Sequence, residues 1–404
     1  MLQIETWWLF ALPIVFALGW VGARWDMRLE KRENEIERLA QQKSTFKGLN
    51  LLLNEEPDKA IDALVQIAQL DPETTELHFA LGSLFRRRGE TERAIRVHQH
   101  LANREDLPSR HRDHAAYELG RDFLRAGLLD RAETSLNRVS TDSKYGIPAK
   151  ESLLEMYQVE KDWEKAIVSS NELEVLQGKS RQKEVAHFHC ELAEEALRRK
   201  DISAAEKHIN LAMQSVPNHP RATILRGDCF VAQNQLEKAI ATWSLIAENH
   251  PAYLALVADR WIDVHKVLSK ADQGLQVLVD ALKTQAAGEL LDITFKHVMA
   301  LRGVPQAEAL MTEVMRHTPS LSAMALRVQA RLTLAEVAQN DKATQEFKAS
   351  YGLLKQRTNT LARYTCGNCG FRARRFYWQC PGCNHWESYS PRRGEGAAPS
   401  GPSM

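Results

Sequence analysis

The sequence predicts an all-α protein: a solenoid of repeated helix pairs, with a transmembrane helix at its N-terminus and a small cysteine-rich module near its C-terminus. Three observations predict it: an uncharged apolar run near the start, a pattern that recurs about every 34 residues, and the concentration of the cysteines in one late stretch. Gly and Pro are sparse through the middle, which favours helix. The net charge of +1 gives no overall field that would indicate a nucleic acid or an acidic membrane surface as partner.

The first element is the apolar run from Thr6 to Ala23, which contains no charged residue. A helix of 18 residues spans roughly 27 Å, close to the thickness of the hydrocarbon core of a bilayer. A cleaved signal peptide would need a basic region before the run and a small-residue cleavage site after it. Here the only charged side chain before the run is Glu5, and large Trp residues crowd its far end. Basic residues follow the run and none precedes it; they are Arg24, Arg28, Lys31 and Arg32. Residues 1–23 are therefore predicted to be a retained single-pass anchor, with the bulk of the protein on the cytoplasmic side.

The second element, residues 24–40, is predicted to be a helical stalk. It is highly charged, rich in helix-forming residues, and contains neither Pro nor Gly. Its apolar positions are too few to establish a coiled coil, which needs several heptads. The sequence therefore neither predicts nor excludes a homo-oligomer formed through the stalk.

The third element is a repeat over residues 41–362. Two segments share Leu-Gly, an aromatic three residues after the Gly, a second Gly, and an Ala five residues later. The first carries these residues as Leu81, Gly82, Phe85, Gly89 and Ala94, and the second as Leu119, Gly120, Phe123, Gly127 and Ala132. This is the tetratricopeptide signature, a helix–turn–helix unit of about 34 residues. Further copies start near residues 41, 147, 186, 220 and 288, with a degenerate copy around Trp261. Such units stack into a solenoid whose concave surface usually holds another protein.

Basic side chains fall on or near the predicted concave face of two adjacent repeats. They are Arg86, Arg87, Arg121 and Arg125. A basic strip could bind an acidic segment of a partner, and the alternative is that these arginines are simply solvated. The Lys and Asn residues of the carboxylate-clamp type of these repeats are missing at the expected positions, so recognition of a partner's extreme C-terminus is not predicted.

The fourth element, residues 363–390, holds four of the six cysteines. Cys366 and Cys369 form one pair with two residues between them, and Cys380 and Cys383 form the other. Two such turns joined by a hairpin direct four sulfurs at one point, and tetrahedral sulfur coordination selects zinc or a single iron. Disulfides conflict with a reducing cytoplasm, and no βαβ pattern supports a thioredoxin-type redox pair. Because protein sulfur fills every position, the predicted site is structural and closed to a catalytic water.

The run RARRFYW between the two pairs has two interpretations. Basic and aromatic residues together can bind nucleic acid. Alternatively Phe376, Tyr377 and Trp378 form the core of the module or the face by which it docks on the solenoid. We favour the second interpretation, because a module of about 30 residues needs its metal and such docking for stability.

The other thiols and histidines give weaker signals. Cys190 and Cys229 lie within repeat helices and are predicted to be buried structural thiols. His187 and His189 are two residues apart and therefore point to different faces of one helix, so no second metal site is predicted. Residues 391–404 are rich in Gly, Pro and Ser and are predicted to be a disordered tail.

The frame YTCGNCGF…WQCPGC resembles rubredoxins, which hold iron and often take up zinc instead. The combination of anchor, repeats and four-cysteine module resembles the lipopolysaccharide assembly protein B family of Gram-negative bacteria, as do the strings LGSLFRRRGETERAIR, AHFHCELA and RYTCGNCGFRARRFYWQCPGC. The family's metal ligands fall on Cys366, Cys369, Cys380 and Cys383.

This resemblance implies a non-enzymatic adaptor or scaffold in the inner membrane, with a periplasmic N-terminus. The family assists an FtsH-type membrane protease in degrading the deacetylase that commits precursors to lipid A, and it gathers other proteins of lipopolysaccharide synthesis or transport. No nucleic-acid partner is implied. Two alternatives remain: a rubredoxin-like electron carrier on a repeat scaffold, and a zinc ribbon that binds nucleic acid.

Overall fold

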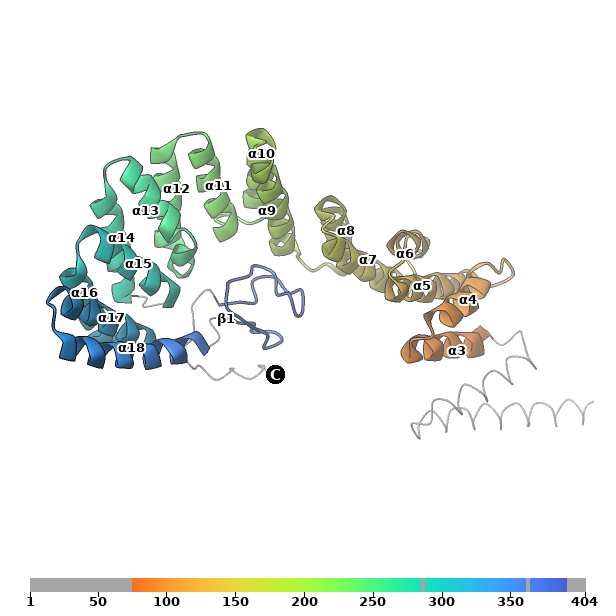
Figure 1. The fold of residues 1–404 in the computed structure, drawn as a ribbon. Helices are drawn as coiled ribbons and strands as arrows, with labels where there is room; N and C mark the ends of the chain where they lie inside the picture. The colour runs from red at the N-terminus through yellow and green to blue at the C-terminus, as the bar shows by residue number, and fades with distance from the viewer. Residues whose placement is uncertain (1–74, 285–287, 361–363, 391–404) are drawn as a thin grey trace, which may run out of the picture. The chain divides into compact units, whose positions relative to one another are not determined.

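A computed structural model describes residues 75–284, 288–360 and 364–390 (Figure 1). The predicted anchor, stalk, first repeat copy and C-terminal tail lie outside the described residues. Within the described ranges, no helix combines the length and the apolar character that a membrane span requires.

The chain divides into two compact units, residues 1–160 and 161–404. In the first unit each helix packs on the next one, and α3 and α7 also pack on α5. This is the contact pattern of stacked helix pairs. Its helices are α3 (Thr75–Arg88), α4 (Thr91–Ala102), α5 (Ser109–Ala126), α6 (Leu129–Leu136) and α7 (Gly146–Glu160).

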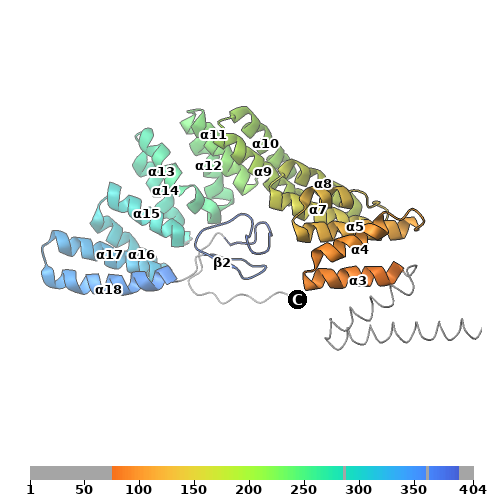
Figure 2. The ribbon, with the colours of Figure 1, turned by 45° about the vertical axis from the view of Figure 1, so that its right-hand side comes forward.

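The second unit continues the helix pairs and adds the C-terminal module. Its helices are α8 (Trp163–Gln177), α9 (Gln182–Arg198), α10 (Ile202–Ser215), α11 (Pro220–Ala232), α12 (Leu236–Asn249), the 3-10 helix η1 (Pro251–Leu256), α13 (Ala258–Val267), α14 (Ala271–Thr284), α15 (Gly288–Leu301), α16 (Val304–His317), α17 (Leu321–Val337) and α18 (Asp341–Thr360). The strands β1 (Tyr364–Thr365) and β2 (Arg372–Ala373) pair antiparallel, with Tyr364 opposite Ala373. Figures 1 and 2 show the module on the inner side of the arc that α11 to α18 form.

The small residues of the repeat pattern lie where paired helices approach closely. Six alanines of the pattern are fully buried: Ala94, Ala132, Ala166, Ala205, Ala239 and Ala307. Gly227 on α11 faces the ring of Trp243 on α12, and a Cβ atom built on Gly227 would lie 2.0 Å from Trp243 Nε1. The same indole nitrogen donates a hydrogen bond to the carbonyl oxygen of Ile224 at 3.1 Å. Glycine is therefore required beside this large side chain, because any other residue would overlap it.

The turn between the two helices of a pair places one residue in the left-handed region. Gly127 ends α5 with φ of 73°, as expected for a glycine after a helix C-terminus. Other residues adopt the same conformation at the equivalent turns: Lys161, Lys200, Asn234, Ser269 and Gln339. The turn geometry is thus maintained in repeats whose sequence lacks the glycine.

The predicted fold class, a tetratricopeptide-repeat solenoid with a small C-terminal module, is confirmed. Helices begin at Thr75, Gly146, Pro220 and Gly288, at or next to starting points taken from the sequence. The degenerate copy around Trp261 forms α13 and α14. The structure contains a further pair, α17 and α18, for which the repeat pattern gave no starting point. The transmembrane part of the predicted fold falls on residues that the structure does not describe.

Candidate metal centre

Two similar turns position the four thiols. In the first, the backbone N–H of Gly370 donates to the carbonyl oxygen of Cys366 at 3.0 Å, and Gly370 has φ of 74°. In the second, the N–H of Asn384 donates to the carbonyl oxygen of Cys380 at 2.8 Å, and Asn384 has φ of 57°. Glycine and asparagine are the residues that adopt this left-handed conformation most readily. Each turn therefore closes so that both of its sulfurs point to the same side.

The four sulfurs converge on one point. Sγ of Cys366 lies 3.7 Å from Sγ of Cys383, and Sγ of Cys369 lies 3.7 Å from Sγ of Cys380. All four sulfurs lie within 4.8 Å of one another. A tetrahedron with metal–sulfur bonds of about 2.3 Å has edges of about 3.8 Å. The spacing and the donor set thus fit one ion, and they suit zinc and iron equally.

Hydrogen-bond donors surround the sulfurs. The N–H of Gly382 donates to Sγ of Cys380 at 3.3 Å, and the side-chain amide of Asn368 donates to Sγ of Cys383 at 3.4 Å. Burial raises the pKa of the Cys383 thiol, but hydrogen bonds to its sulfur, led by those from the Asn368 side chain and from the backbone of His385, outweigh burial and bring the pKa down to about 6. Metal binding requires thiolates, so the protein prepares this sulfur to act as a ligand.

The module has a very small core of its own. Tyr364, Cys380 and Tyr389 are buried, and Phe376 and Tyr377 pack against them. A core of this size is insufficient for a domain of fewer than about 40 residues, which usually needs disulfides, a metal or association with another surface.

Trp386 supplies one part of the contact between the module and the helices. Its ring stacks on His187 of α9, with centroids 4.8 Å apart and an interplanar angle of 19°. It also meets Phe188 of α9 and Trp163 of α8 edge-on, at 5.7 and 6.0 Å. The indole therefore contacts aromatic side chains from two consecutive helices.

Trp378 supplies a second part of the contact. Its ring stacks on Tyr253 of η1 at 5.1 Å, and the guanidinium of Arg221 on α11 lies 5.9 Å from its centroid. The hydroxyl of Tyr364 donates to the carboxylate of Glu289 on α15. These contacts agree with the interpretation of Phe376, Tyr377 and Trp378 as core and docking face of the module.

The structure also reveals a group that the sequence did not predict. Glu387 of the module reaches His187 of α9 and His219 at the start of α11. His187 and His189 diverge as predicted, since His189 instead faces His208 with 3.3 Å between their Nδ1 atoms. The missed signal is the spacing of His187 and His219, which is close to one repeat and puts them side by side in the stack.

The predicted arginines have different surroundings. Arg86 is largely buried and pairs with Glu118 and with Asp122, the latter at 2.7 Å. Arg121 is exposed and lies 3.3 Å from Glu118. Arg87 and Arg125 are also exposed. Arg86 thus connects α3 to α5, and three arginines of the set face solvent.

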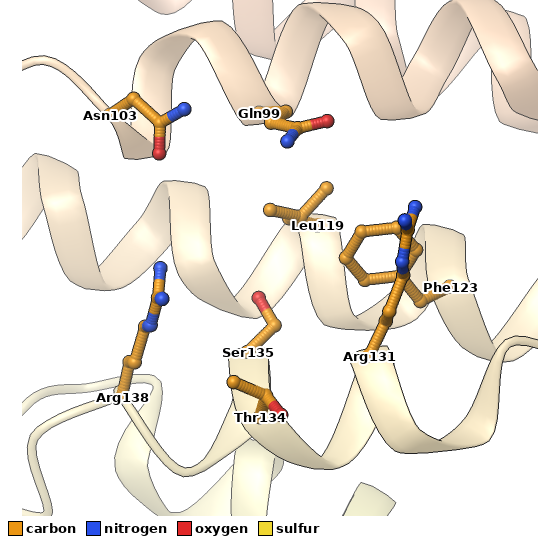
Figure 3. A pocket seen from close by; sticks show the side chains of 8 residues that line it. All are labelled: Gln99, Asn103, Leu119, Phe123, Arg131, Thr134, Ser135 and Arg138. Atoms are coloured by element: carbon orange, nitrogen blue, oxygen red, sulfur yellow. The ribbon is translucent and has the colours of Figure 1, made fainter.

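A pocket of about 290 Å³ lies between α4, α5 and α6 of the first unit (Figure 3). It is lined by Gln99, Asn103, Leu119, Phe123, Arg131, Thr134, Ser135 and Arg138. Two arginines and no carboxylate line it, so its charge is positive. None of the four predicted arginines belongs to this lining.

Comparison with known proteins gives consistent matches. Residues 364–391 match the family described as rubredoxin metal binding domain, and residues 47–99 and 190–253 match the tetratricopeptide repeat family. The chain is 29% identical over 384 residues to lipopolysaccharide assembly protein B of Escherichia coli K12, covering 95% of this chain and 97% of that protein. This chain is thus similar to lipopolysaccharide assembly protein B along nearly its whole length. The protein of that name from Haemophilus influenzae is 25% identical over 390 residues, covering 94% of this chain and 96% of that protein.

The resemblance found in the sequence is thereby confirmed. A solved structure titled MamA RS-1 ArsTM double mutant aligns at 19% identity over 43% of this chain and 93% of its own, with a TM-score of 0.32. That likeness is too weak to support an inference about this chain.

Proposed function

We propose that this protein is a non-enzymatic adaptor of the inner membrane that regulates lipopolysaccharide synthesis. The observation that carries the proposal is a closed four-thiol module, docked on repeat helices, in a chain that aligns almost end to end with lipopolysaccharide assembly protein B. Repeat solenoids hold other proteins, and a tetrathiolate site offers no open position for substrate.

The metal ligands in this proposal are Cys366, Cys369, Cys380 and Cys383. One zinc or iron ion held by them supplies folding free energy to the module. The module in turn covers part of α9, α11 and η1 through Trp386 and Trp378. The ion therefore acts on the solenoid through the docked module.

The proposed mechanism depends on confinement. Residues 1–23 anchor the chain with its N-terminus in the periplasm, and the stalk of residues 24–40 places the solenoid of residues 41–362 on the cytoplasmic side. An FtsH-type protease and the committed-step deacetylase of lipid A synthesis meet on this scaffold, and other lipopolysaccharide proteins gather there. Tethering raises the effective concentration of a bound client near the protease. The exposed arginines Arg87, Arg121 and Arg125 are candidates for contact with an acidic client segment.

The test replaces Cys366 and Cys369 by Ser in cells that express only the variant. Metal content should fall, and the deacetylase should persist longer because its delivery to the protease fails. Cys229→Ser, which alters a buried thiol on α11 outside the module, is the matched control and should retain both metal and deacetylase turnover. Normal deacetylase turnover in the metal-free variant would refute the adaptor mechanism. Full function with redox-inert zinc would eliminate the electron-carrier alternative.

A further inference from the structure

A second group of metal-ligating side chains lies where the module meets the helices. Nε2 of His187 is 3.2 Å from Oε1 of Glu387, and Nε2 of His219 is 3.6 Å from the same oxygen. One ligand atom from each residue lies within 4.8 Å of the other two. A tetrahedral ion with bonds of about 2.0 to 2.1 Å to nitrogen and oxygen has ligand–ligand edges of about 3.3 to 3.4 Å. The distances from Oε1 of Glu387 to Nε2 of His187 and of His219 lie just below and just above this edge length.

The imidazoles lack the hydrogen bonds that buried polar groups normally make. Both side chains are almost completely buried, at 0% exposure for His187 and 1% for His219. Neither ring nitrogen of His187 has a hydrogen-bond partner, nor does Nε2 of His219. Nε2 of His187 instead meets the Glu387 carboxylate as an ion-pair contact at 3.2 Å. Buried polar atoms are rarely left without a partner, and an ion between the three residues would provide one.

The surrounding charges favour a cation. Three carboxylates, those of Glu387, Glu191 and Glu194, lie in this region, and Arg221 pairs with the last two at 2.8 and 2.7 Å. Imidazole nitrogen and carboxylate oxygen are donors that a zinc-like divalent ion accepts.

We propose that His187, His219 and Glu387 form a second metal site, for a zinc-like divalent transition ion, which fastens the module to α9 and α11. Two nitrogens and one oxygen suit such an ion, and water completes its coordination. The N–H of Ala222 donates to Nδ1 of His219 at 3.3 Å. When Nε2 of His219 binds the ion, the ring proton lies on Nδ1. The hydrogen bond from Ala222 to Nδ1 is therefore lost when the ion binds.

Because Glu387 belongs to the module and both histidines belong to the solenoid, the site exists only while the module is docked. Occupancy of the second site therefore depends on the first. Loss of the four-thiol ion should release both ions, whereas loss of the second ion should leave the four-thiol ion in place.

The test measures the zinc content of the full-length protein in detergent, after zinc loading and removal of unbound ion. Wild type should hold two equivalents, and the Glu387→Gln and His219→Gln variants one each. His189→Gln alters a neighbouring histidine of α9 that faces away from the site and should keep two. With cobalt in place of zinc, the charge-transfer absorption of the four-thiol site should be unchanged in both single-equivalent variants.

Three results would overturn the proposal. Wild type holding one equivalent would mean that the three residues meet without an ion. Two equivalents in both Glu387→Gln and His219→Gln would place the second ion elsewhere. Glu387→Gln could also lose the four-thiol absorption, and its zinc content would then not report on the second site alone. His219→Gln leaves every residue of the module unchanged and provides the test in that case. Two zinc equivalents in His219→Gln would then refute the proposed site.

Discussion

Replacing Trp386 by Ala should loosen the module from the helices without removing any of its thiols. Truncating a buried Trp to Ala costs about 3 to 5 kcal/mol. Trp386 is only partly buried, and each of its three aromatic contacts contributes about 0.5 to 1.5 kcal/mol. We therefore expect a loss of about 2 to 3 kcal/mol from docking, which is on the order of 100-fold in the docking equilibrium.

The rate of zinc transfer to a coloured chelator measures this change in the full-length protein. A module with so small a core depends on docking. The rate of zinc release from Trp386→Ala should therefore exceed the wild-type rate by up to roughly the factor by which the docking equilibrium changes. Val175→Ala on α8, at a side chain 84% exposed, should behave like wild type. Equal release rates for Trp386→Ala and wild type would show that the module retains its ion without help from α8 and α9.

Three further predictions test the repeats, the half-buried imidazole of His114 and the thiols. Gly227→Ala should destabilise the protein by about 1 to 3 kcal/mol, measured by urea unfolding, since its Cβ atom would overlap Trp243. Burial lowers the pKa of His114 to about 4; the unfolded chain then binds a proton that the folded chain does not, so stability should fall by up to about 2 kcal/mol between pH 7 and pH 5, and His114→Phe should flatten this slope. Replacing Cys366 and Cys369 by Ser should abolish metal binding, measured by elemental analysis, while the helical circular dichroism signal persists.

The sequence predicts the repeats well where they keep their small residues. Ala94 and Ala132 mark the close approach of two helices, and both are fully buried, because a larger side chain would separate the pair. The pair α17 and α18 was not detected because it lacks this alanine. Its turn residue Gln339, with φ of 55°, is followed five residues later by Thr344, where the pairs that keep the pattern have a buried Ala.

The convergence of the thiols could be predicted, and so could docking through the aromatic run that contains Trp378, but the helices on which the module docks could not. Two residues between paired cysteines define a local turn, so the convergence of Cys366 and Cys369 follows from short-range geometry. Trp386 and His187 are about 200 residues apart in the chain, and their stacking depends on how the whole solenoid curves. No local pattern encodes that curvature. For the same reason the meeting of Glu387 with His219 is visible only in three dimensions.

Docking couples metal binding by the module to the arrangement of the solenoid helices. The module's own core is too small to fold alone, so the free energy of metal binding is also free energy for the docked arrangement of α9, α11 and η1. Such coupling is reciprocal. A client that binds the solenoid only while the module is docked will strengthen metal retention by the same factor by which the metal strengthens client binding. In a repeat array, each helix contacts mainly its neighbours. The docked module adds a longer connection between helices as far apart as α8 and α15. Its contacting side chains are Trp386, Trp378 and Tyr364.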